Sequence, residues 1–271
     1  MRWSFRRTLV LLSSILVLYI VGIFFIYIFI DFIVFSPVIH PAKARYKLDL
    51  PYQEIKLNHP NGEQVNMLAF NQQAPLKGYV LFFHGANKSA DFWAAYAPFL
   101  TERGFKLFIP DYRGYGKSDG SPSEISWNED AQLALSWLKT QASEDSIIFY
   151  GVGLGASAAA YLATINPCRI VILENPVYGL RSWMRSSFPL LMLPYELKYD
   201  FNLYEYIPNI VSPTIILQTK KSKDLNKLEQ THLQSLLPDP NNFIWLDHSD
   251  KSFPLEDEEY IRLFDQLVKS L

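Results

Sequence analysis

Residues 8–30 form a continuous uncharged, mostly apolar run that ends at Asp31. At a rise of about 1.5 Å per residue, a helix of this length crosses a hydrocarbon core of about 30 Å. A buried core helix is seldom apolar on every side over such a length, so the run predicts a transmembrane helix. The alternative is a cleaved signal peptide. Its candidate cleavage site at residues 42–44 lies well past the apolar run, which favours a retained single-pass anchor.

A different pattern begins after residue 50. Residues 52–58 and 64–71 are predicted strands, and the segment between them contains Asn61-Gly62. Because Asn-Gly tolerates the positive φ angles of a tight turn, we expect an antiparallel hairpin.

Short apolar segments then alternate with helical ones. Further strands are expected at residues 79–83, 106–109, 146–150, 170–173, 214–217 and 243–246. Helices are expected at residues 90–103, 124–141, 154–165, 226–237 and 257–271. This alternation indicates an α/β fold with a mostly parallel central sheet and helices on both of its faces.

The pattern divides the chain into a basic tail (1–7), a transmembrane helix (8–30), a linker (31–50) and one α/β domain (51–271). Residues 176–208 interrupt the alternation and are rich in aromatic residues, leucine and proline. Two interpretations stay open for this insertion. It is either a lid over a pocket at the strand ends or an extra packing layer without a ligand.

Charge and composition exclude several classes of protein. The net charge is −2 without a basic stripe, so no nucleic-acid partner is expected. The single cysteine, Cys168, excludes a disulfide framework and a cysteine-based zinc site, and we predict no metal and no cofactor. The expected partner is membrane lipid, contacted through the N-terminal helix, while no particular protein partner is predicted.

The flanking charges bear on membrane orientation. Three arginines lie within residues 2–7, before the apolar run, and favour an N-terminus in the cytoplasm. Basic residues within 43–47 weaken this bias. We therefore expect a non-cytoplasmic globular domain, in a periplasmic, extracellular or lumenal location.

Glycine-containing motifs follow three of the predicted strands. They are FFHGAN at residues 82–87, DYRGYGKSDG at 111–120 and YGVGLG at 150–155. Together they resemble the α/β-hydrolase superfamily, specifically its membrane-anchored branch with a D-Y-R-G-Y-G loop. The resemblance covers about residues 50–270 and implies an α/β-hydrolase fold.

The third motif corresponds to the hydrolase nucleophile elbow, which has the form G-x-S-x-G. The outer glycines, Gly151 and Gly155, are present, but the central residue is Gly153. Glycine has no side-chain oxygen, so an acyl-enzyme cannot form at this position.

The resemblance places the other two triad members after the last two strands. The acid position holds Ser222 and the base position holds Lys251. Asp224 would replace the acid only in a rebuilt loop. His248, an alternative base, falls three residues before the base position, where the family has glycine. Because the triad works as a unit, the sequence favours a pseudo-hydrolase that acts by binding or interaction.

The resemblance also implies an oxyanion hole, made by the backbone N–H groups of Ala86 and Leu154. Backbone donors survive side-chain substitution, so a site for a small acyl or anionic ligand is one interpretation; the other is a vestigial turn that binds only water. Arg113 would either contact an anion or brace the loops around the elbow. The expected pocket loops contain His84, Gly85, Asp111 and Arg113.

An active hydrolase with relocated residues is the alternative function, with ester, thioester or lipid acyl substrates. Ser157 lies in a second G-x-S-x-A sequence, one turn into the helix after the elbow. The other candidate is a dyad of Ser222 and Lys251, in which a desolvated lysine would activate the serine.

Overall fold

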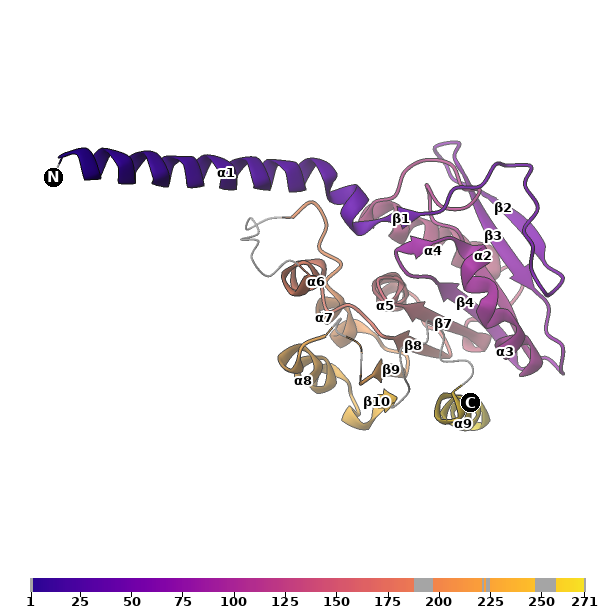
Figure 1. The fold of residues 1–271 in the computed structure, drawn as a ribbon. Coiled ribbons are helices and arrows are strands. Elements are labelled where there is room, and N and C mark those ends of the chain that lie inside the picture. Colours follow the sequence, from indigo (N-terminus) through magenta and orange to yellow (C-terminus); the bar gives the residue numbers. More distant parts are fainter. Residues whose placement is uncertain (1, 188–196, 221, 223–224, 247–256, 271) are drawn as a thin grey trace.

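A mixed eight-stranded sheet forms the centre of the computed structural model, in the order β10-β9-β8-β7-β4-β6-β3-β2 (Figure 1). The structure describes residues 2–187, 197–220, 222, 225–246 and 257–270. The strands are β2 (Gln53–Asn58), β3 (Gln64–Phe70), β4 (Gly78–Phe83), β6 (Phe105–Pro110), β7 (Ile147–Val152), β8 (Ile170–Glu174), β9 (Thr214–Thr219) and β10 (Phe243–Leu246).

The pairing confirms the predicted hairpin and the mostly parallel sheet. Strands β2 and β3 are antiparallel, as are β3 and β6, whereas the pairs from β6 through β10 are parallel. The interior strands read as continuous apolar runs because helices cover both of their faces.

The helices of the described residues are α1 (Arg2–Val34), α2 (Ala90–Trp93), α3 (Ala97–Glu102), α4 (Glu124–Leu138), α5 (Gly155–Ile165), α6 (Leu180–Ser187), α7 (Leu203–Tyr206), α8 (Lys227–Leu236) and α9 (Glu258–Ser270). Helices α4, α5 and α8 pack in one hydrophobic core, and α2, α3 and α9 in the other.

The helix predicted at residues 90–103 is interrupted. A 3₁₀ turn at Ala94–Tyr96 separates α2 from α3, and Pro98 lies in the first turn of α3. Proline lacks the N–H that a continuous α-helix would need at this point, so the break precedes it.

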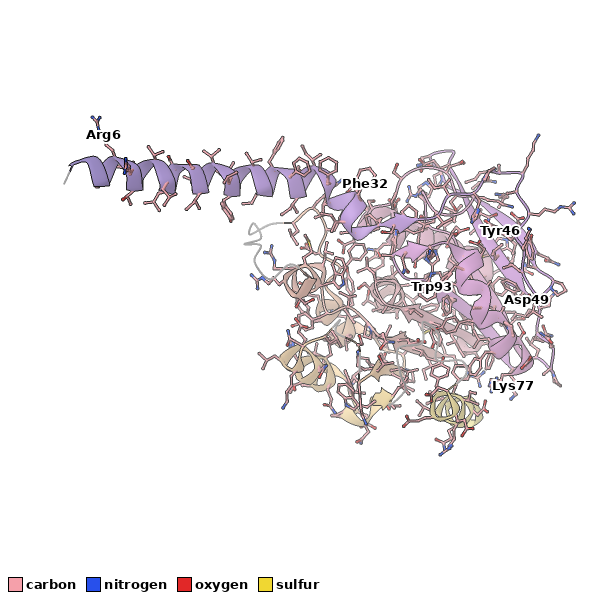
Figure 2. All side chains as sticks on the ribbon, in the orientation of Figure 1. Arg6, Phe32, Tyr46, Asp49, Lys77 and Trp93 are labelled. Atoms are coloured by element: carbon pink, nitrogen blue, oxygen red, sulfur yellow. The ribbon has the colours of Figure 1, made fainter. Side chains whose placement is uncertain are left out.

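Helix α1 extends from the domain and is long and apolar enough over Phe5–Val34 to cross a membrane (Figures 1 and 2). It continues past Asp31, where the sequence predicted a linker. The Asp31 carboxylate accepts hydrogen bonds from Lys198 Nζ at 2.8 Å and from the Tyr199 hydroxyl at 2.7 Å. These partners come from far along the chain and compensate the charge of Asp31, so the helix continues past it to Val34.

The chain after α1 is attached to the domain. Strand β1 (Ser36–Pro37) pairs in parallel with β5 (Asn87–Lys88). The Ser36 N–H donates to the Ala86 carbonyl at 2.9 Å, and the His40 N–H donates to the Gly116 carbonyl at 2.7 Å. The first part of the predicted linker therefore lies against the loops that follow β4 and β6.

Candidate functional site

The turn between β7 and α5 has the backbone of a nucleophile elbow. Gly153 has φ +58°, in the left-handed region, and its N–H donates to the Glu174 carbonyl at 2.9 Å. A Cβ on Gly155 would lie 2.2 Å from the Phe83 carbonyl oxygen, so this close approach requires glycine. At Gly153, by contrast, an added Cβ would meet nothing within 4 Å. The elbow therefore leaves open space where a nucleophile side chain would stand.

A cavity of about 290 Å³ adjoins this space. Four parts of the chain line it: the end of α1 with Ser36, the loop 85–87 with Trp93, the elbow at Gly153 and Leu154, and the insertion. The insertion contributes Val177, Leu180 and Trp183. Its described part thus forms one wall of the cavity.

A buried histidine fixes the orientation of the peptide group between Gly85 and Ala86. His84 Nδ1 lies 2.8 Å from the Gly85 carbonyl oxygen, and it must carry the hydrogen because a carbonyl only accepts. In a trans peptide the N–H is directed opposite to the carbonyl. The Ala86 N–H therefore points away from the atom that His84 fixes, and Ala86 is a lining residue of the cavity.

Neither the Ala86 N–H nor the Leu154 N–H donates to an acceptor among the described residues. Leu154 directly precedes α5, whose N-terminus adds a partial positive charge. Two backbone donors from separate loops thus adjoin one cavity. A carbonyl or carboxylate oxygen is the group that such donors stabilise.

His84 is fully buried and does not line the cavity. Burial lowers the pKa of its imidazole to about 4, so the ring is neutral at physiological pH. Its Nε2 has no hydrogen-bond partner among the described residues and lies 4.0 Å from Asp111 Oδ1. His84 therefore lies in a loop that lines the cavity through Gly85 and Ala86, and its own side chain orients a peptide group from within the core.

The D-Y-R-G-Y-G loop supports the same peptides. The Tyr112 hydroxyl donates to the His84 carbonyl at 3.1 Å, and the Tyr115 hydroxyl donates to the Ala86 carbonyl at 2.8 Å. Asp111 is fully buried and accepts the Ala90 N–H at 2.7 Å, and burial raises the pKa of its carboxyl to about 7. Asp111 therefore fixes the start of α2 and does not line the cavity.

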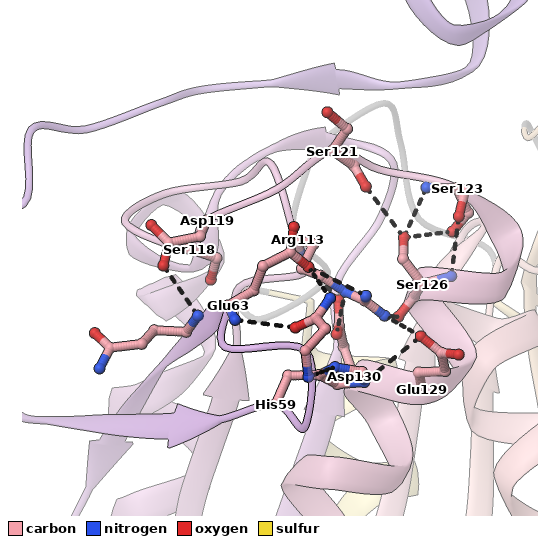
Figure 3. A network of polar contacts seen from close by, with 12 residues as sticks. His59, Glu63, Arg113, Ser118, Asp119, Ser121, Ser123, Ser126, Glu129 and Asp130 are labelled. Carbon is pink, nitrogen blue, oxygen red and sulfur yellow. Dashed lines mark hydrogen bonds and ion pairs between the residues drawn. The ribbon is translucent and has the colours of Figure 1, made fainter.

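Arg113 braces the surrounding loops (Figure 3). Its Nε donates to Asp130 Oδ1 at 2.8 Å, its Nη1 donates to Glu63 at 3.3 Å, and its Nη2 donates to Glu129. Asp130 also accepts the Arg113 backbone N–H at 2.7 Å. With three carboxylates around it and no place in the cavity wall, Arg113 fits the bracing interpretation and not the anion contact.

The relocated nucleophiles gain no support from the described residues. Ser157 is 1% exposed, and its hydroxyl donates to the Phe201 carbonyl at 3.2 Å, so it joins α5 to the insertion. Ser222 is half-buried just past the end of β9, where its N–H donates to the Thr219 carbonyl at 3.1 Å. Asp224, His248 and Lys251 lie outside the described residues, so the dyad stays a prediction.

A serine, a histidine and an aspartate also meet beside the cavity loops. His40 Nε2 lies 3.2 Å from Asp91 Oδ1 and 3.3 Å from Ser89 Oγ, and the Ser89 hydroxyl donates to Asp91. A triad uses both nitrogens of its histidine, one for the nucleophile and one for the acid. Here both partners share Nε2, and Ser89 is 1% exposed. The hydrogen bonds of this cluster therefore attach the chain after α1 to the start of α2.

Glu174, at the end of β8, is a buried polar group whose environment the sequence did not reveal. It accepts hydrogen bonds from the hydroxyls of Tyr96, at 2.9 Å, and Tyr150. The Tyr150 hydroxyl lies 2.6 Å from that of Tyr260. Burial raises the pKa of the Glu174 carboxyl to about 7. The three tyrosines come from distant segments, so no local signal indicates their convergence.

These buried groups predict an unusual pH dependence. Burial raises the pKa values of Asp111 and Glu174 to about 7 and that of Asp130 to about 6, and it lowers that of His84 to about 4. Between pH 7 and pH 5, the folded state therefore holds more protons at the three carboxyls and fewer at the imidazole. The net effect is that the free energy of unfolding rises as pH falls across this window.

Urea unfolding of the full-length protein in detergent at pH 5, 6 and 7 measures this slope. Glu174→Gln removes one of the titrating groups, so its slope is expected to be shallower by about one proton. Stability that decreases from pH 7 to pH 5 would contradict the assignment.

The sheet and the elbow together define an α/β-hydrolase fold, and the comparisons agree. Residues 74–236 match the family model described as "Serine aminopeptidase, S33". The chain belongs to this α/β-hydrolase family.

Similar proteins include an uncharacterized membrane protein of Saccharomyces cerevisiae, 40% identical over 97 residues, which are 34% of each chain. An uncharacterized protein of Mycobacterium tuberculosis is 31% identical over 140 residues, covering 51% of this chain and 50% of the relative. Protein bem46 of Schizosaccharomyces pombe is 38% identical over 95 residues, covering 34% and 32%. The chain thus matches a third to a half of the length of these relatives.

Among solved structures, the Pyrococcus furiosus esterase Pf2001 is similar, with a TM-score of 0.67 and 17% identity; 87% of this chain and 97% of that chain are covered. An alpha-beta hydrolase from Vibrio vulnificus has a TM-score of 0.65 and 18% identity, with 81% of each chain covered. At these identities the likeness establishes the fold.

Proposed function

We propose that the protein is a membrane-anchored pseudo-hydrolase that binds a small acyl or anionic ligand beside Gly153. One observation carries this proposal. The backbone donors of Ala86 and Leu154 adjoin a cavity, while the position between them that should hold the nucleophile has no side chain.

The contacts around the donors support retained binding. The Ala86 peptide group and its neighbour are held by His84, Tyr112 and Tyr115, which are all buried. Pre-oriented donors stabilise an oxyanion or carbonyl without reorganisation, and this property does not depend on a nucleophile. The apolar walls suit a ligand with a hydrocarbon portion.

Tryptophan fluorescence tests the binding, because Trp93 and Trp183 line the cavity. Titration of the full-length protein with octanoate is expected to give a saturable change that Trp183→Phe diminishes. Octylammonium has the same chain but no acceptor oxygen, so it is expected to bind much more weakly. Equal affinities for octanoate and octylammonium would show that the backbone donors do not contribute to ligand recognition.

Restoring the nucleophile alone is expected to leave ester hydrolysis at the background rate. A serine has room at Gly153, since a Cβ there meets nothing within 4 Å, but the φ of +58° adds backbone strain and the base position holds Lys251. The matched comparison is the triple variant Gly153→Ser, Ser222→Asp, Lys251→His, which is expected to gain measurable turnover of p-nitrophenyl butyrate. Efficient hydrolysis by Gly153→Ser alone would show that the base has been assigned wrongly.

We propose that the globular domain lies outside the cytoplasm, because the arginines before the apolar run favour an N-terminus in the cytoplasm. Val211 is 91% exposed and the one native cysteine, Cys168, is buried, so Val211→Cys gives a selective label site. A membrane-impermeant maleimide is expected to label this variant in intact cells. Labelling that requires permeabilisation of the plasma membrane alone, with internal membranes still sealed, would place the domain in the cytoplasm.

A further inference from the structure

The register of α1 in a bilayer follows from its length. It has 33 residues, whereas about 20 residues fill a hydrocarbon core. If the core begins after Arg7, it is filled by about residue 27. The last turns of α1 then lie at the level of the lipid headgroups. The ion pair between Asp31 and Lys198 lies at the same level, where charged groups are solvated.

This part of α1 is also a wall of the cavity. Ile33 and Val34, in the last turn of the helix, line it together with Ala86 and Leu154. The anchor therefore brings the cavity to the membrane surface. A ligand that reaches the backbone donors along α1 passes over apolar side chains.

Helix α6 also lines the cavity, and its composition suits a location at the membrane surface. Leu180 and Trp183 line the cavity, and Met184 is buried. Arg181 and Arg185 are four residues apart and share another face, where Arg185 is exposed. Arginine and tryptophan beside an apolar surface are typical of a membrane–water interface.

We propose that the cavity takes a single-chain amphiphile directly from the bilayer. The acyl carbonyl or carboxylate accepts hydrogen bonds from the Ala86 and Leu154 N–H groups, and the chain runs between Ile33 and Trp183 toward the membrane. A cavity of about 290 Å³ is small for a two-chain phospholipid. This inference rests on the proposed function and adds the ligand class and its route of entry.

The experiment uses the full-length protein in phosphatidylcholine nanodiscs. The probes are a fatty acid and a lysophosphatidylcholine, each with a diazirine in the chain, and peptide mass spectrometry maps the adducts. Adducts are expected within the cavity, on Leu154, Leu180 or Trp183. The probe that labels identifies the headgroup, and labelling by either one supports the proposal. A diazirine-bearing two-chain phosphatidylcholine is expected to label only the lipid-exposed face of α1.

Two variants narrow the entrance and one serves as their control. Ile33→Trp adds bulk to a lining residue. Ser36→Trp does the same at a lining residue that is exposed, so the folded protein can accept the larger side chain there. Each is expected to lower the yield of cavity adducts by about tenfold. Phe32→Trp changes a side chain that is 76% exposed and is expected to have no effect.

Failure of this inference is distinguishable from failure of the proposed function. A water-soluble diazirine acid of short chain, added to the protein in detergent, tests the donors without the bilayer. Cavity adducts from this acid, with lipid adducts only on the exposed face of α1, would overturn the bilayer route alone. Equal yields in the variants at residues 32, 33 and 36 would also overturn it. Absence of cavity adducts from every probe would overturn both proposals.

Discussion

Replacing Arg113 with methionine is expected to lower the free energy of unfolding by about 3–5 kcal/mol, because it leaves a buried carboxylate without its partner. Asp130 is fully buried and accepts hydrogen bonds from both the side chain and the backbone of Arg113. Methionine preserves most of the side-chain volume but removes the charge and all the donors. Chemical unfolding of the full-length protein at pH 7 measures the difference.

Arg103 provides the matched control. It forms an ion pair with Asp265 at 2.6 Å, but the Asp265 side chain is 41% exposed. Arg103→Met is therefore expected to cost no more than about 1 kcal/mol. If the two substitutions cost the same, the loops around the elbow are not held by the Arg113 network.

A methyl group at Gly116 is expected to cost about 3 kcal/mol, combining backbone strain with a clash. Gly116 has φ +53°, and an added Cβ would lie 2.0 Å from Asp111 Oδ2. Asp111 cannot move away easily, because it is fully buried and its carboxylate holds the Ala90 N–H. The substitution Gly116→Ala should also weaken ligand binding, since Tyr115 in the same loop supports the Ala86 carbonyl.

Gly62→Ala separates the two contributions. Gly62 also has a positive φ, +90°, but an added Cβ there meets nothing within 4 Å. It is expected to cost about 1–2 kcal/mol from strain alone and to leave octanoate binding unchanged. If Gly116→Ala and Gly62→Ala lowered the free energy of unfolding equally, the Asp111 side chain would have moved away from the methyl group without cost.

The parts of the fold that depend on local patterns were predictable. Asn61-Gly62 marks the hairpin, and the apolar runs mark the parallel strands, because a strand covered on both faces must be apolar throughout. The elbow could also be recognised, since Gly155 is required wherever a helix begins this close to a neighbouring strand. Boundaries moved where a distant partner intervened, as at Asp31, whose charge Lys198 compensates.

The site was only partly predictable for the same reason. The sequence identified the motif residues around the elbow but not which of them face the cavity. His84, Asp111 and Arg113 lie in the predicted loops, yet each is buried and bonded to backbone or carboxylate groups. The contribution of α1 to the cavity wall was also missed, because residues after the apolar run read as a linker. Ile33 lines the cavity because distant contacts hold the end of α1 to the domain: the chain after α1 pairs with the loop after β4, and Asp31 pairs with Lys198.

We propose that the elbow retains its backbone donors and has lost its covalent chemistry. Intact-mass spectrometry of the full-length protein after incubation with a fluorophosphonate tests this most directly, with the triple variant Gly153→Ser, Ser222→Asp, Lys251→His as the positive control. This loss of covalent chemistry predicts an unmodified mass for the native protein and one adduct on residue 153 of the variant. A stoichiometric adduct on native Ser157 or Ser222, together with ester hydrolysis that disappears when that serine is replaced by alanine, would contradict it.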